Sequence, residues 1–186
     1  MSYYVYLISS LPMLHFGAKP PFSSERFLKM CEELIPETDL KVLEPLTLDP
    51  LPIGEREGVR GKCTIFTLAR WFDFDTALRN ELVKIRASRK HIDPAKYLRK
   101  DSLSEPSVAH AAMNAYRNTS ILEAEKMLDQ ERWRFLDEIS FGHYFDIDFL
   151  VIYALKLRIL ERWEKIDTFD KAQEVERLCY KNEQAA

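Results

Sequence analysis

At 186 residues, the chain is long enough for one domain of ordinary size with its own hydrophobic core. Its 46% hydrophobic and 12% aromatic residues are typical of a globular protein, and its net charge of −3 argues against nucleic-acid binding by the protein as a whole. The cysteines Cys31, Cys63 and Cys179 are widely spaced and form no C-x-x-C pair, which favours buried thiols in a reduced cytoplasmic protein. No signal peptide is evident, and the longest apolar run, 149–155, is far below the ~20 residues that span a bilayer.

The first third of the chain is rich in proline and is predicted to be irregular. Seven of the nine prolines and four of the five glycines precede Lys62. Within this part, Ser23-Ser24-Glu25-Arg26 can cap a helix that ends at Pro36 and buries Phe27, Leu28, Cys31, Leu34 and Ile35. The apolar stretch 3–10 fits a buried strand or a helical turn, and 46–61 is predicted to be a long loop.

The remaining two thirds are predicted to be helical. A helix over 67–91 carries no proline or glycine and has one apolar stripe, formed by Trp71, Leu78, Leu82 and Ile85. Pro94 and Pro106 bracket a short connecting element, and the alanine-rich stretch 107–117 predicts a small helix suited to close packing.

A capping-box pattern, S-x-x-E, occurs at Ser120-Ile121-Leu122-Glu123 and predicts the start of the next helix. Its expected buried stripe is Ile121, Ala124, Leu128, Phe135 and Ile139, while Leu122 and Trp133 lie off that stripe and indicate a second neighbour. Gly142 is placed to end this helix, because glycine adopts the left-handed conformation at little cost.

Asp146 is expected to cap a helix over 147–164 that is apolar nearly all round. Such a helix must be surrounded by other helices, so it is predicted to be the centre of a bundle. A last, polar helix is expected over 168–181. The predicted fold is therefore an all-α helical bundle, a single domain over 1–186, with an irregular proline-rich N-terminal third.

The side chains of His143, Asp146 and Asp148 crowd around Gly142 and resemble a functional cluster. They could act as general acid and base or as ligands for a hard metal ion. The alternative is structural: Asp146 is an N-cap, Asp148 favours the positive end of the helix, and His143 fills the tight turn. No H-x-x-x-H or H-E-x-x-H spacing occurs, and no nucleophile elbow or phosphate loop occurs either. The structural interpretation is preferred, and no metal, cofactor or catalytic residue is predicted.

The segment 79–100 contains eight basic and two acidic residues, a net charge of +6 in a chain whose total is −3. On a helix, Arg79, Arg86 and Lys90 share one flank, because spacings of seven and four residues return to the same side. This flank fits a solvated helix face, a docking face for an acidic partner, or an RNA surface. The last is weakened by the lack of a glycine-rich or stacking aromatic motif.

Three blocks of the sequence resemble a small bacterial family of unassigned function whose genes tend to lie within V-type (archaeal-like) rotary ATPase operons. The blocks are residues 3–12, Leu78-Arg79-Asn80-Glu81-Leu82 with Arg86 and Asp93-Pro94, and residues 133–163. The most specific of them contains Phe141-Gly142-His143-Tyr144-Phe145-Asp146. Residues 153–160 are also similar in character to helices of the ATPase C subunit, called d in the eukaryotic enzyme.

The resemblance implies a stand-in for the C subunit, the all-helical adaptor that joins the central rotor shaft to the membrane ring. This chain departs from the C subunit in size. The C subunit is nearly twice as long and is built from related helical modules, and no such modules are detected in this sequence. We expect a non-enzymatic subunit or assembly factor of a V-type ATPase, with Arg79, Arg86 and Lys90 facing a stalk or ring subunit. It is expected in the cytoplasm, reaching the membrane only through a complex, without membrane insertion or nucleic acid. The competing hypothesis is a metal-dependent or acid–base enzyme centred on His143, Asp146 and Asp148.

Overall fold

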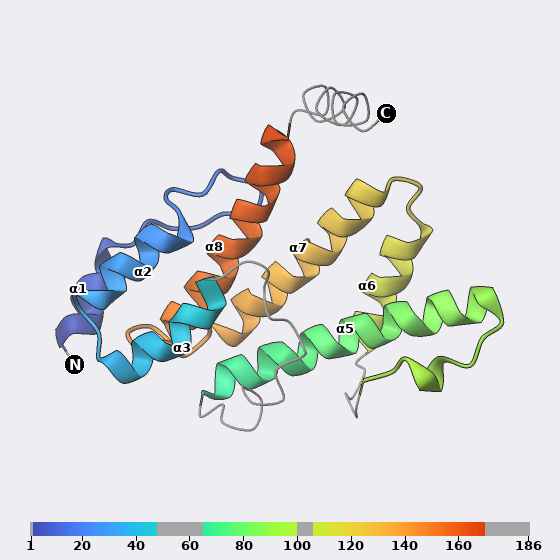
Figure 1. The fold of residues 1–186 in the computed structure, drawn as a ribbon, viewed down its shortest axis with the longest axis horizontal. Helices are drawn as coiled ribbons and strands as arrows, with labels where there is room; N and C mark the ends of the chain where they lie inside the picture. The colour runs from blue at the N-terminus through green and yellow to red at the C-terminus, as the bar shows by residue number, and fades with distance from the viewer. Residues whose placement is uncertain (1, 48–64, 100–105, 170–186) are drawn as a thin grey trace, which may run out of the picture.

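The computed structural model describes residues 2–47, 65–99 and 106–169, and these form seven α-helices and one 3-10 turn without any strand (Figure 1). The prediction of an all-α bundle is therefore confirmed. In chain order the elements are α1 (Ser2–Ser10), α2 (Ser24–Glu32), α3 (Glu37–Thr47), α5 (Phe66–Lys90), η1 (Pro94–Lys96), α6 (Pro106–Arg117), α7 (Ile121–Ile139) and α8 (Ile147–Thr168). Most of the predicted loop 46–61 and of the predicted helix 168–181 lies outside the described residues. Among the helices described, none combines the length and the apolar character that a membrane crossing requires.

The central element is α8, which contacts α2, α3, α5 and α7 (Figure 1). Every residue from Leu150 to Leu160 is buried except Lys156, as expected for a helix that is apolar nearly all round. The helix continues four residues beyond the predicted end at Glu164. It also supplies an acceptor to a neighbour: Glu161 Oε1 accepts a hydrogen bond of 2.6 Å from the Ser24 amide in the first turn of α2. The central helix of the bundle therefore also satisfies an orphan backbone donor of a neighbouring helix.

The bundle contains two hydrophobic clusters. The main core is built by α1, α2, α3 and α8, the first half of α5 and the second half of α7. The outer core is smaller and joins the second half of α5, α6 and the first half of α7, through Ala77, Leu78, Val108, Ala112, Ala115 and Leu128. Small residues on α6 allow this helix to lie close to α5 and α7, as the alanine-rich sequence predicts. The second half of α5 packs in the outer core and extends away from α8 (Figure 1).

The described part of the N-terminal third, residues 2–47, contains three helices. Its ambiguous first stretch is a helix, α1, which buries Leu7 and Ile8, and α2 begins after Ser23 as expected. Helix α3, which was not predicted, begins after Pro36 and contains Pro45 in its last turn.

Packing explains why the two prolines do not prevent α3. Pro36 immediately precedes α3, and its carbonyl accepts hydrogen bonds from two amides in the first turn. At this position a backbone N–H would have no partner within the helix, so the N–H that proline lacks costs no helical hydrogen bond. Pro45 removes one helical hydrogen bond, but Leu43 and Leu46 are buried against the main core. The carbonyl of Leu46 also accepts a 3.0 Å hydrogen bond from the buried Arg158 of α8. Tertiary contacts therefore outweigh the helix-breaking tendency of proline here.

The predicted buried stripe of α7 is only partly correct. Leu128 and Ile139 are buried, but Ile121 is 83% exposed, whereas Trp133 and Leu136 are buried off that stripe. The difference arises because α7 contacts α5, α6 and α8, so its buried surface is wider than one stripe. Ile121 lies in the first turn, at the edge of these contacts.

Cys31 is fully buried in α2, and burial together with the charge of Glu32 raises the pKa of its thiol to about 12. At pH 8 its thiolate fraction is therefore on the order of 10⁻⁴, and the thiolate is the reactive form. In a chain that carries Cys63→Ser and Cys179→Ser, we expect a disulfide-exchange reagent to modify Cys31 only as fast as the protein opens. The same chain in denaturant should react at once. Rapid labelling of the folded protein would contradict the burial of this thiol.

Candidate functional site

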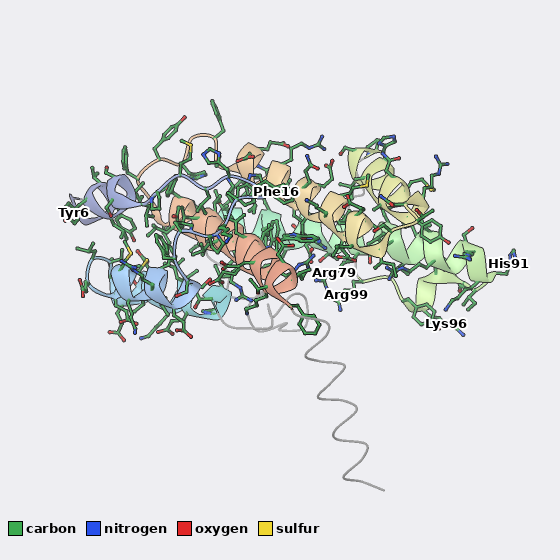
Figure 2. All side chains as sticks on the ribbon, turned by 90° about the horizontal axis from the view of Figure 1, so that it is seen from above. Tyr6, Phe16, Arg79, His91, Lys96 and Arg99 are labelled. Atoms are coloured by element: carbon green, nitrogen blue, oxygen red, sulfur yellow. The ribbon has the colours of Figure 1, made fainter. Side chains whose placement is uncertain are left out.

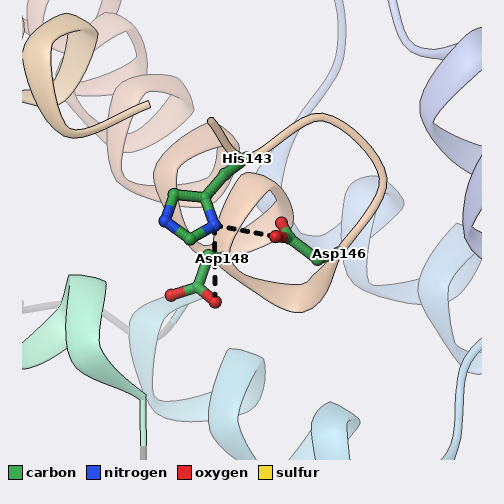
Figure 3. A group of neighbouring side chains, drawn as sticks. All are labelled: His143, Asp146 and Asp148. Carbon is green, nitrogen blue, oxygen red and sulfur yellow. Dashed lines mark hydrogen bonds and ion pairs between the residues drawn. The ribbon is translucent and has the colours of Figure 1, made fainter. Parts of the chain in front are cut away.

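The turn between α7 and α8 brings together His143, Asp146 and Asp148 (Figure 3). Gly142 has φ +91°, a left-handed conformation that favours glycine, and it reverses the chain just before His143. The Nδ1 atom of His143 lies 2.7 Å from Asp146 Oδ2 and 3.8 Å from Asp148 Oδ2. All three side chains are partly buried, and their ligand atoms lie within 4.8 Å of one another.

Each carboxylate in this cluster also caps a helix with its second oxygen. Asp146 Oδ1 accepts a 3.0 Å hydrogen bond from the Phe149 amide in the first turn of α8. Asp148 Oδ1 accepts a 3.4 Å hydrogen bond from the Thr67 amide in the first turn of α5. Because the N-cap residue of α5, Ile65, has no side-chain acceptor, Asp148 provides that acceptor from another helix. His143 therefore faces two carboxylates that are already held by helix N-termini.

Imidazole and carboxylate groups can bind a divalent metal, so the cluster has suitable donor atoms. The positive ends of α5 and α8 both point at the carboxylates, however, and this field stabilises the two anionic side chains without a further cation. His143 and Asp146 also satisfy each other directly. The geometry therefore favours a structural turn that joins the starts of two helices.

We expect His143→Gln to leave partner binding and the fold largely intact, because glutamine can still donate a hydrogen bond to Asp146. Metal analysis of the purified wild-type protein is expected to find no stoichiometric zinc, manganese or iron. As a control, Asp146→Ala removes an N-cap and should lower the free energy of unfolding by about 1 kcal/mol. One metal per chain in the wild type, lost in His143→Gln, would instead favour the enzyme hypothesis.

A second polar cluster, which sequence reasoning did not identify, lies at the junction of α5, α7 and α8. Asp75 and Asp129 are each 1% exposed. Arg132 bridges them, with Nε 3.0 Å from Asp75 Oδ1 and Nη1 2.8 Å from Asp129 Oδ1. Asp129 Oδ2 in turn accepts from Arg162 Nη2 at 2.7 Å and from Trp163 Nε1 at 2.9 Å.

The charges in this junction are balanced by their partners. Burial lowers the pKa of Arg132, but the charges of Asp75 and Asp129 outweigh it, and the net shift is upward. The guanidinium is therefore held firmly in its charged form. In the sequence, the only signal for this junction is that the acidic residues stand three or four positions before arginines, at Asp75 and Arg79 and at Asp129 and Arg132. That spacing is equally common on solvated helix faces.

The structure separates the three residues of the predicted basic flank. Arg79 belongs to the buried junction, since its Nε lies 2.7 Å from Asp75 Oδ2. Arg86 and Lys90 are exposed further along α5, and no acidic residue among those described pairs with either of them. Figure 2 shows Arg79 near the middle of the molecule and His91, next to Lys90, at its far end. The surface available to a partner therefore begins beyond Arg79.

Comparison with known proteins gives one match. A family model described as a protein of unknown function (DUF2764) matches residues 110–179, which include α7, the turn at Gly142 and α8. That description names no activity, partner or complex. No curated protein and no solved structure matches the chain. The C-terminal half of the bundle, with the histidine turn, is thus the part that is similar to a family whose function is unknown.

Proposed function

We propose that the protein is a non-enzymatic subunit or assembly factor of a V-type rotary ATPase, a reduced C-like adaptor between rotor shaft and membrane ring. The observation that carries this proposal is the exposed positive charge on the outer half of α5, in a chain whose total charge is −3. The resemblance of three sequence blocks to an ATPase-operon family supplies the identity of the complex. In this proposal the protein works in the cytoplasm and reaches the membrane only through its partners.

The charge pattern supports a docking role because it is unfavourable for an isolated protein. Arg86 and Lys90 are neighbours at i and i+4 on one face, and like charges at this spacing repel. An acidic surface on a stalk or ring subunit would offset this repulsion and would steer association. An all-helical scaffold is also the architecture that the adaptor role implies.

The proposed complex can be tested in cells that encode the protein. A tagged copy at its native locus should co-purify with V-type ATPase subunits in a fixed ratio, while an equally tagged unrelated cytoplasmic protein should not. Quantitative mass spectrometry of the eluates measures the ratio. If the tagged chain is recovered without any ATPase subunit, the proposal is wrong.

Reversing the exposed charges is expected to slow this association. We predict that Arg86→Glu with Lys90→Glu lowers the association rate with the ATPase on the order of tenfold in low salt, with a smaller effect as the salt concentration rises. Arg79 should be left unchanged, because a glutamate there would face the buried Asp75 and would destabilise the fold. The matched control is Lys29→Glu with Lys41→Glu on α2 and α3, which alters charge equally on exposed lysines elsewhere. Equal rates for the wild type and the α5 variant would mean that this flank is only solvated.

The enzyme hypothesis is supported by one observation, the convergence of His143, Asp146 and Asp148 within 4.8 Å. It requires a bound metal or a substrate proton at His143, and the metal analysis described above tests the metal-dependent form. A positive result there, together with failed co-purification, would make the enzyme the better explanation.

A further inference from the structure

The outer end of α5 continues into a compact helical hairpin. After Lys90 the chain turns at His91, which has φ +54°, and returns along α5 through η1 to Arg99. Figure 2 shows His91 and Lys96 at the end of the molecule opposite Tyr6 of α1. We call residues 86–99 the outer hairpin.

The outer hairpin is held in one conformation by hydrogen bonds at both of its ends. At its base, the buried Asn80 donates from Nδ2 to the carbonyl of Arg99 at 3.0 Å, and Asn80 Oδ1 accepts from the Arg99 amide at 3.0 Å. At its tip, the Ile92 amide donates to the Ala87 carbonyl, which closes the end of α5. Asp93 Oδ1 accepts from the Ala95 amide at 2.9 Å and caps η1. The return segment is therefore preorganised against α5.

The surface of the outer hairpin combines apolar and cationic side chains. Ile92 is 45% exposed and Tyr97 is 60% exposed, and no residue of the hairpin belongs to either hydrophobic cluster. Four exposed cations accompany them, namely Arg86, Arg89, Lys90 and Lys96. The only acidic residue of the hairpin, Asp93, already accepts a hydrogen bond as a cap. Apolar anchors beside charged residues that stay in solvent are the arrangement found at protein interfaces.

We propose that the outer hairpin is the docking element of the protein, and that it fits a protein segment in which an apolar side chain is flanked by aspartate or glutamate. This proposal rests on the proposed function in one respect, that the chain acts by binding another protein. A preorganised hairpin reduces the entropy lost on binding a partner of defined shape. Binding to a nucleic acid backbone depends mainly on charge and would gain little from the fixed geometry.

The charge of the rest of the chain also favours a local acidic segment over an extended polyanion. Segment 79–100 carries +6, so the remaining residues carry −9. An anionic membrane or a long nucleic acid would be repelled by that remainder wherever it passed beyond the hairpin. A short acidic segment that contacts only the hairpin would not be.

Photo-crosslinking in the native cell tests the docking element directly. Tyr97 is replaced by p-benzoylphenylalanine in the full-length chain, and adducts formed on irradiation are mapped by mass spectrometry to residues of the partner. The matched control places the same photoreactive group at Tyr144 in the α7–α8 turn, where the side chain is 59% exposed against 60% for Tyr97. A second chain adds Arg89→Glu and Lys96→Glu to the Tyr97 replacement, and a third adds Asn80→Ala. Thermal melts establish that each chain is folded.

The expected result is an adduct from position 97 on an Asp/Glu-rich protein segment, absent or much weaker from position 144. The charge reversals should reduce it on the order of tenfold, and Asn80→Ala should reduce it in a chain whose melt shows that the bundle remains folded. If the adducted segment belongs to a V-type ATPase subunit, both proposals are supported. If it belongs to another protein and the tagged chain does not co-purify with ATPase subunits, the docking element stands and the proposed function fails.

Other outcomes overturn the docking element itself. These are the absence of an adduct at position 97, an adduct only with lipid or nucleic acid, equal yields from position 144, or a yield unchanged by the charge reversals. When one of them occurs while the tagged chain still co-purifies with the ATPase, the proposed function stands and the contact lies elsewhere on the bundle.

Discussion

Replacing Leu155 with alanine is expected to lower the free energy of unfolding by about 2–5 kcal/mol. Leu155 is 2% exposed near the middle of α8, where four other helices surround that element. The substitution removes buried methyl groups and leaves a cavity that the neighbouring helices cannot fill without moving. Urea and thermal melts followed by circular dichroism measure the change.

The matched control is Leu122→Ala, which makes the same chemical change on α7 at a side chain that is 49% exposed. It should alter the free energy of unfolding by no more than about 0.5 kcal/mol. If Leu155→Ala has an effect as small as that of the control, α8 is not the packed centre of the bundle.

Removing the carboxylate of Asp129 should destabilise the protein by about 3–5 kcal/mol. The substitution Asp129→Ala leaves the buried Arg132 with only Asp75 and deprives Trp163 Nε1 of its acceptor. A buried charge or donor that has lost its partner incurs a desolvation penalty that solvent cannot relieve. The half-exposed Arg162 contributes less, because water and salt screen its interaction.

Two further substitutions separate the parts of this effect. Asp137→Ala removes an ion pair with Lys156 in which the acid is 56% exposed, so water screens the interaction, and it should change stability by about 1 kcal/mol or less. Trp163→Phe keeps most of the apolar volume and removes only the hydrogen bond to Asp129. A double-mutant cycle between Asp129 and Trp163 then measures their coupling energy. An effect of Asp129→Ala no larger than that of Asp137→Ala would show that the junction is not buried in solution.

The fold could be predicted where local signals and packing agree. Helix α8 combines an acidic N-cap, Asp146, with an apolar surface all round, so both its start and its central place follow from the sequence. Helix α3 could not be predicted, because Pro36 and Pro45 argue against a helix locally and only the burial of Leu43 and Leu46 makes it stable. Propensity is a weak guide wherever tertiary contacts oppose it.

The candidate sites were harder to predict, because periodicity places a residue on a face without showing what covers that face. Arg79 shares a flank with Arg86 and Lys90 by spacing, yet its partner Asp75 is buried by helices that come later in the chain. For the same reason, the hydrogen bond between Asp148 and the first turn of α5 could not be predicted from the local sequence, because 81 residues separate Asp148 from Thr67. Such contacts are determined by the topology of the bundle.

The length of α5 has a mechanical consequence. Its 25 residues form one uninterrupted helix about 37 Å long at 1.5 Å per residue, and its described sequence contains neither proline nor glycine. One end is anchored by a carboxylate of α8 in the main core, and the other end carries the outer hairpin. Between these two ends, ion pairs of Asp75 with Arg79 and with Arg132 of α7 attach α5 to the rest of the bundle. A force on the outer hairpin would therefore reach the histidine turn, which caps the start of α5, along one uninterrupted helix.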